Sequence, residues 1–173
     1  RCDTGSIVLD GIDMHLQPEA ARRRIGLCPQ ELVIWETLTC LEQLTFVGTQ
    51  YDLPRREARR RSEELLDVLG LAAKTNRRAK TLSGGMKRRL NLALALVHDP
   101  EIVLMDEPFS GLDPVNTRLV KEIMEEQRQA GRTIVMSTHQ MHQVETLCNR
   151  IVLIHRGRSV LYGEVDQIQR EFS

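Results

Sequence analysis

The sequence predicts an α/β domain in which helices flank a parallel sheet and an all-helical segment is inserted between about residues 37 and 81. Strands alternate with helices along the chain, which is typical of this fold class. Residues 102–105 are apolar at four consecutive positions, as expected of a parallel strand that is covered on both faces. A length of 173 residues suits one domain with a substantial core.

The first half of the chain predicts two short strands and two helices. A turn at Gly11 ends the first strand, and Pro29 stops the second. Apolar side chains recur along one face of each predicted helix, while Pro54 suits the first turn of the second helix and Gly70 suits its end. The four elements are strands at residues 6–10 and 24–28 and helices at residues 39–51 and 55–69.

The second half predicts further strands and helices in alternation. Ser83 is a good N-cap for the first helix, and Gly131 ends the second. A tight turn at residues 156–157 joins two apolar runs into a hairpin. The elements are helices at residues 83–97, 114–130 and 141–148, buried strands at 102–105 and 133–136, the hairpin strands 151–154 and 159–162, and a terminal helix from Asp166.

Composition excludes several classes of protein. Equal numbers of basic and acidic residues, 24 of each, argue against a nucleic-acid binder. Basic runs such as residues 59–61 have acids nearby and are expected to be solvated helix faces. No apolar stretch approaches the roughly 18–20 residues that span a bilayer, so we expect a soluble protein whose membrane role comes through a partner.

Cysteine usage predicts reduced thiols in a cytosolic protein. The four cysteines are widely spread and form no C-x-x-C pair, which makes a zinc site or a disulfide framework improbable. They are Cys2, Cys28, Cys40 and Cys148.

A Ser-Gly-Gly turn opens the helix predicted after residue 82. The N-terminus of a helix offers unpaired backbone N–H groups and the positive end of the helix dipole, so it attracts anions. Gly84 and Gly85 carry no Cβ, which lets a phosphate approach the backbone closely. Ser83, Gly84 and Gly85 are therefore candidates for a phosphate site.

Two acids, Asp106 and Glu107, directly follow the apolar strand at residues 102–105. In sheets of this class, ligands bind beyond the carboxyl ends of the strands. A carboxylate there can bind Mg²⁺, which prefers oxygen ligands, and a neighbouring carboxylate can deprotonate an attacking water.

The motifs at residues 82–88, 102–107 and 110–114, in this order, resemble the ATP-binding cassette (ABC) family, the ATP-driven motors of membrane transporters. The resemblance covers essentially the whole chain and implies a P-loop NTPase-like fold with ATP and Mg²⁺ as cofactors. It implies two partners, a second cassette and a transmembrane permease, and no nucleic acid is expected. The resemblance also implies that the permease holds the cassette at the inner face of the membrane. Residues 82–89 and 137–141 are most similar to bacterial exporters of drugs, sodium or lipids.

The resemblance also implies roles for single residues. Ser83, Gly84 and Gly85 form the signature motif, which closes over ATP held by the second cassette. Asp106 binds the metal, Glu107 is the general base and His139 is the switch histidine that positions the nucleophile. Gln30 contacts the metal and the nucleophilic water. Asp113 belongs to the D-loop that couples the two sites, and it also suits the N-cap of the next helix.

The phosphate loop of this family, G-x-x-x-x-G-K-[ST], does not occur among the 173 residues, because no lysine follows a glycine. We therefore expect an N-terminally truncated cassette that binds ATP weakly or not at all by itself, with an exposed sheet edge. Its expected parts are a partial ATPase core at residues 1–36, a helical subdomain with the signature motif at 37–98, and the rest of the core at 99–173.

Two alternatives to an exporter ATPase stay open. One is a catalytically silent subunit that lends its signature motif to a complete partner, although Glu107 and His139 argue against a silent site. The other is a fragment of an ABC protein of translation or DNA repair, although the chain shows neither the charged linker nor the long coiled coil of those classes.

Overall fold

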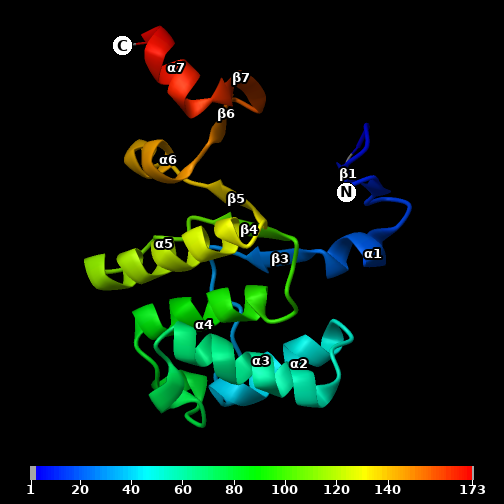
Figure 1. Ribbon diagram of the computed structural model, residues 1–173, viewed down its shortest axis with the longest axis vertical. Coiled ribbons are helices and arrows are strands. Elements are labelled where there is room, and N and C mark those ends of the chain that lie inside the picture. The colour runs from blue at the N-terminus through cyan, green and yellow to red at the C-terminus, as the bar shows by residue number, and fades with distance from the viewer. Residues whose placement is uncertain (1–2, 173) are drawn as a thin grey trace. The chain divides into compact units, whose positions relative to one another are not determined.

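The chain divides into two compact units, Arg1–Met136 and Ser137–Ser173, and the computed structural model describes residues 3–172 (Figure 1). The first unit begins with an antiparallel hairpin of β1 (Val8–Leu9) and β2 (Ile12–Asp13). Its turn places Asp10 and Gly11 at positive φ, 47° and 77°, as a tight type I′ turn requires. The predicted turn at Gly11 is confirmed, whereas helix α1 (Pro18–Arg23) was not predicted from the sequence.

The central sheet has the strand order β3-β4-β5, with β3 (Ile25–Cys28), β4 (Ile102–Asp106) and β5 (Thr133–Ser137). β3 and β4 are parallel, and Cys28 pairs with Met105. The carboxyl ends of these two strands therefore lie at the same edge of the sheet. The predicted α/β fold with a parallel sheet is confirmed, and the strands at 24–28, 102–105 and 133–136 lie within one or two residues of their expected bounds.

One face of the sheet is buried and the other is not. Val103, Met105 and Cys28 are at most 2 % exposed, because they face helix α4, whereas Leu27 on the opposite face is 59 % exposed. On β5, Val135 is 52 % exposed. On β4, Ile102 and Leu104 are only half-buried, and every residue of β5 is half-buried or exposed. The expectation that residues 102–105 are covered on both faces and the expectation that the strand at 133–136 is buried are therefore wrong for the described residues, because hydrophobic runs do not reveal which segment covers them.

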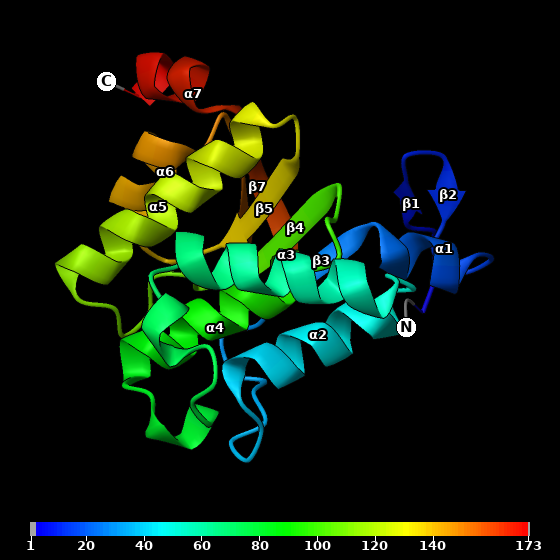
Figure 2. The same cartoon turned by 60° about the horizontal axis from the view of Figure 1, so that its bottom comes forward.

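The all-helical segment is built from α2 (Cys40–Gln50), α3 (Arg55–Val68), the 3₁₀ turns η1 (Ala72–Lys74) and η2 (Ala79–Thr81), and then α4 (Gly84–Leu96). Figure 2 shows α2, α3 and α4 running side by side, and all three pairs are in contact. Thr39 and Glu42 form a complete capping box at the start of α2. Leu44, Leu66 and Leu90 are fully buried and form the core between these helices. Pro54 is the N-cap of α3.

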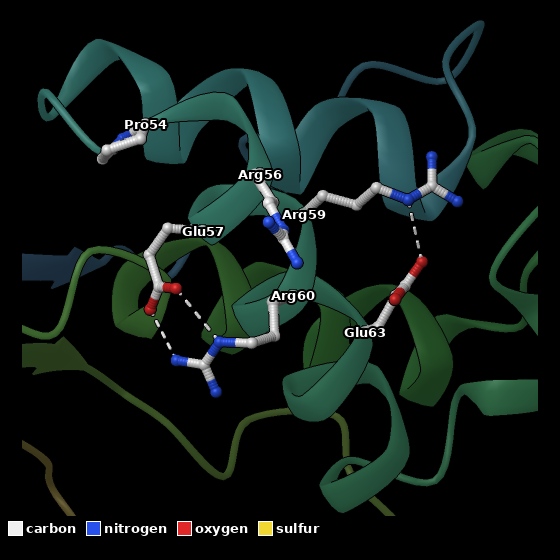
Figure 3. Close-up of a pocket in the computed structure, with 6 residues that line it drawn as sticks. All are labelled: Pro54, Arg56, Glu57, Arg59, Arg60 and Glu63. Carbon is white, nitrogen blue, oxygen red and sulfur yellow. Dashed lines mark hydrogen bonds and ion pairs between the residues drawn. The ribbon is translucent and has the colours of Figure 1, made fainter.

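The outer face of α3 is charged and solvated. A shallow hollow on this face is lined by Pro54, Arg56, Glu57, Arg59, Arg60 and Glu63 (Figure 3). Arg60 pairs with Glu57 at 2.5 Å and Arg59 with Glu63 at 3.0 Å, three and four residues apart on the helix. Exposed pairs of this kind stabilise a helix by only about 0.2–0.5 kcal/mol each. The arginine run at residues 59–61 is thus largely the solvated face that was expected.

Burial of His98 after the end of α4 predicts a pH-dependent stability. The ring stacks on Tyr51 at 3.7 Å and its Nε2 lies 3.0 Å from the Ile25 carbonyl oxygen. Burial lowers the pKa of His98 below 6.5, mainly by desolvating the charged form. At acidic pH, His98 therefore binds a proton more readily in the unfolded chain than in the folded chain. The free energy of unfolding consequently falls as the pH falls from about 7 through the ordinary histidine range.

This loss is checked by urea unfolding at pH 7.5 and pH 5.5. His98→Phe keeps the stack on Tyr51 and does not titrate, so we expect its free energy of unfolding to fall less between the two pH values than that of the unchanged chain. An equal fall in both proteins contradicts the assignment.

The remaining helix of the first unit is α5 (Pro114–Gln129), capped by Asp113 and followed by Gly131 at a φ of 83°. The second unit, described by itself, contains α6 (Met141–Leu147), β6 (Arg150–His155), β7 (Arg158–Glu164) and α7 (Val165–Phe172). β6 and β7 form the predicted antiparallel hairpin, and its turn residues Arg156 and Gly157 both have positive φ.

Two sequence expectations concern cysteines and membrane spans. Cys28, Cys40 and Cys148 are free thiols, and Cys2 lies outside the described residues. Within residues 3–172, no helix has both the length and the apolar composition needed to cross a membrane.

Candidate functional site

The N-terminus of α4 is exposed and has the chemistry of an anion-binding site. Ser83 caps the helix, and its hydroxyl oxygen accepts a hydrogen bond from the Met86 N–H at 3.4 Å. Ser83 and Gly84 are exposed, and the first turn carries no acidic residue. A Cβ added to Gly84 would meet no atom within 4 Å. The free backbone N–H groups and the helix dipole at this point favour a phosphate.

The N-terminus of α5 lies against the second glycine of this turn. Asp113 Oδ1 accepts a hydrogen bond from the Asn116 N–H at 2.8 Å, and Oδ2 accepts one from Asn116 Nδ2 at 2.5 Å. These hydrogen bonds hold the pKa of Asp113 below its ordinary value. A Cβ added to Gly85 would lie 2.9 Å from Asn116 Nδ2. The sequence-predicted residues Gly85 and Asp113 are thus brought together through Asn116, which sequence reasoning did not single out.

A second group of predicted residues lies at the carboxyl edge of the sheet. Asp106 is the last residue of β4, Glu107 follows it, and Gln30 lies two residues beyond the neighbouring strand β3. Asp106 and Gln30 are exposed, whereas Glu107 is half-buried. Glu107 has a φ of 44°, a left-handed conformation that is unfavourable for a residue with a side chain. Such strain at the end of a strand is typical of functional positions.

Arg88 links the two strand ends and was missed by the sequence analysis. Its side chain is 6 % exposed and extends from α4. Nη1 donates to the carbonyl oxygens of Pro29 and Gln30, at 3.0 and 2.6 Å. Nη2 donates to those of Asp106 and Glu107, at 3.0 and 2.7 Å. A signal was available in the sequence, because Arg88 shares a helical face with the apolar residues four and seven positions later.

Asn91, one turn further along α4, holds the loop after β3. Its Oδ1 accepts a hydrogen bond from the Val33 N–H at 3.0 Å, and its Nδ2 donates to the Pro29 carbonyl oxygen at 3.3 Å. Nδ2 also lies 3.5 Å from Cys28 Sγ. Burial raises the pKa of Cys28, so this thiol stays protonated. The loop carrying Gln30 is thus fixed to α4 by side chains rather than by strand pairing.

His139 lies two residues beyond the end of β5 and is exposed. It belongs to the second unit, whereas Gln30, Asp106 and Glu107 belong to the first. Its role toward a phosphate therefore stays a prediction. His142, expected to be an exposed helix residue, is exposed on α6.

The donor set at the strand ends fits Mg²⁺ bound in the usual way for a nucleotide site. Asp106, at the end of β4, offers a carboxylate oxygen, and Gln30, in the loop after the adjacent parallel strand β3, offers an amide oxygen. Mg²⁺ typically takes one or two protein oxygens and completes its shell with water and phosphate oxygens. Among residues 3–172, no cluster of three or more histidine, cysteine or acidic side chains could hold a metal ion.

Comparison with known proteins places this geometry in a family. The family model described as ABC transporter matches residues 1–110. The chain is 38% identical, over 161 residues, to the linearmycin resistance ATP-binding protein LnrL of Bacillus subtilis, covering 93% of this chain and 52% of LnrL. It is 37% identical to the Nod factor export ATP-binding protein I of Rhizobium etli, covering 93% of this chain and 51% of that protein.

A solved structure gives the same result. The structure of an ATP-binding subunit of an ABC transporter superposes with a TM-score of 0.88 at 33% identity, covering 98% of this chain and 71% of that one. The chain thus spans about half the length of the two bacterial relatives and 71% of the length of the solved subunit. The motifs, the fold and these likenesses show that the chain belongs to the ABC transporter family and resembles its ATP-binding subunits.

Proposed function

We propose that this chain is part of an ATPase that drives export of a substrate through a membrane permease. The observation that carries the proposal is the edge of the sheet, where Asp106 ends β4 and the strained Glu107 follows it, beside the loop that carries Gln30. Because the chain spans about half the length of relatives such as LnrL, the activity is proposed for the whole protein.

Glu107, Asp106 and Gln30 each have one task at this edge, and a separate task is proposed for His139 of the second unit. Glu107 accepts the proton of the attacking water, which a half-buried carboxylate at the end of a strand is well placed to do. Asp106 and Gln30 hold Mg²⁺, which when bound supplies positive charge to the phosphate oxygens. His139 donates a hydrogen bond to the terminal phosphate and orients it.

The signature turn completes the site of a second cassette. Ser83, Gly84 and Gly85 present their backbone N–H groups to the phosphates of ATP held by that partner. Asp113 lies close to this turn through Asn116, so the D-loop moves with the surface that closes on the nucleotide. ATP binding then draws two cassettes together, and hydrolysis releases them.

The proposed organisation has three parts. Residues 1–36 and 99–173 belong to the ATPase core, and residues 37–98 form a helical subdomain that carries the signature motif. The permease is proposed to hold the cassette at the inner face of the membrane. The names of two relatives, a linearmycin resistance protein and a Nod factor export protein, support an export direction.

Gly84→Asp in the full-length protein tests this proposal. Gly84 has open space around it, and an acid in the first turn favours a helix, so the variant should fold normally. Its carboxylate repels the phosphate, and we expect ATP hydrolysis to fall about 100-fold or more, as when an oxyanion-stabilising group is lost.

Gly84→Ala is the comparison variant, because it adds a Cβ without a charge, and we expect its activity to lie between that of Gly84→Asp and that of the unchanged protein. Affinity for ATP, measured by equilibrium binding, should change little in Gly84→Asp if its turn serves the partner's nucleotide. Normal hydrolysis by Gly84→Asp would contradict the assignment of the turn.

A further inference from the structure

We infer that Arg88 is a positioning residue that sets the general base Glu107 and the glutamine loop (residues 29–33) at a fixed spacing. The inference rests on the proposed function, since it concerns the geometry of that same site. Arg88 lies on α4 and reaches both strand ends through its side chain alone.

The two nitrogens of one planar group divide their bonds between the two strands. Nη1 bonds the carbonyl oxygens after β3, those of Pro29 and Gln30, and Nη2 bonds those at the end of β4. A guanidinium is rigid and planar, so a movement of either strand end strains the bonds on the other side. Arg88 therefore fixes the spacing between the metal-binding glutamine and the acidic pair.

Arg88 also supports the unfavourable turn at Glu107. The Glu107 carbonyl oxygen accepts hydrogen bonds from Arg88 Nη2 at 2.7 Å and from the Ser110 N–H at 3.1 Å. Arg88 Nε lies 3.5 Å from the next carbonyl oxygen, that of Pro108. A residue at a φ of 44° persists only where its surroundings hold it, and these donors contribute to holding Glu107 there.

The same helix begins at the signature turn. Arg88 lies five residues after Ser83, a rise of about 7.5 Å along one rigid helix. Asn91 adds hydrogen bonds to Pro29 and Val33 from the same face. A displacement of α4 when its N-terminus meets a phosphate is thus passed directly to Gln30 and Glu107 of the same chain.

The test compares Arg88→Met with Arg89→Met in the full-length protein. Arg89 is the matched control, since it neighbours Arg88 on α4 and also bonds a backbone carbonyl, that of Leu69 at 2.5 Å, but at the end of α3. We expect Arg88→Met to lower kcat about 10–100-fold with KM for ATP nearly unchanged, because a small misplacement of reacting groups has that effect. Arg89→Met should leave kcat per folded protein within about threefold.

Two further readouts separate positioning from general destabilisation. Arg88→Lys should recover only part of kcat, because one ammonium cannot bond both strand ends in the planar geometry of arginine. Amide hydrogen exchange in segments 29–33 and 106–110 should rise in Arg88→Met and stay unchanged in Arg89→Met. Equal losses of kcat in the two methionine variants, or unchanged exchange in both segments, would overturn the inference.

Glu107→Gln, assayed in parallel, distinguishes failure of the Arg88 role from failure of the proposed ATPase site. If Glu107→Gln is inactive and Arg88→Met is fully active, only the role of Arg88 is wrong. If Glu107→Gln hydrolyses ATP normally, the proposed site itself fails.

Discussion

Glu107→Gln is expected to slow ATP hydrolysis by the full-length protein about 10²–10⁴-fold while leaving ATP binding intact. Glutamine has nearly the shape of glutamate and keeps the same backbone bonds, but its amide does not accept a proton from the attacking water. Glu107 is half-buried directly after β4, so we expect its carboxylate, rather than bulk water, to take the proton of the attacking water. Phosphate release at saturating ATP measures the rate, and equilibrium titration measures the affinity.

Glu101→Gln provides the matched control, because Glu101 precedes the same strand at its opposite end, where it pairs with Arg24 at 3.3 Å. This exposed pair contributes little, so turnover should stay within about twofold of the unchanged protein. Unchanged turnover in Glu107→Gln would remove the general-base role.

Gly26→Ala is expected to destabilise the first unit by about 3 kcal/mol, near the upper end for overpacked cores. A Cβ at this position would collide with the backbone carbonyl of Ala95 and lie 2.8 Å from Pro100 Cγ. The obstructing atom belongs to the helix backbone, so no side-chain rotation relieves the contact. The helix α4 must shift away from β3, and the free energy of unfolding in urea records the cost.

Gly84→Ala serves here as the stability control. Its Cβ meets open space in the first turn of the same helix, and we expect a change within about 0.5 kcal/mol. If Gly26→Ala unfolds at the same urea concentration as Gly84→Ala, then α4 does not pack on β3 as described.

Local signals account for most of the fold that the sequence predicted. Ser83 and Asp113 cap the helices that were expected to follow them, because a cap depends only on the next three residues. Thr39, expected to be the first helical residue, is the N-cap of α2. The turn at residues 156–157 could also be predicted from the local sequence, since its backbone conformation is set within the turn. Asp106 and Glu107 could be predicted as site residues because polar side chains at the end of an apolar strand lie at one edge of the sheet.

What the sequence did not reveal depends on contacts between distant segments. Arg88 meets carbonyls 18 to 59 residues away, and no local pattern specifies which backbone a buried arginine will bond. The exposure of Leu27 and Val135 is likewise a property of what packs on the sheet rather than of the strands. Helix α1 has six residues and no side-chain cap, which left it without a strong local signal.

A mixture of two inactive variants tests whether two cassettes share one ATP site. Gly84→Asp lacks a working signature turn but keeps Glu107, and Glu107→Gln keeps the turn but lacks the base. In a mixed dimer, one site combines the intact Glu107 of one subunit with the intact turn of the other. With random pairing of equal amounts, ATP hydrolysis should recover to about a quarter of the unchanged rate. A rate no higher than that of the separate variants would contradict a site shared between two cassettes.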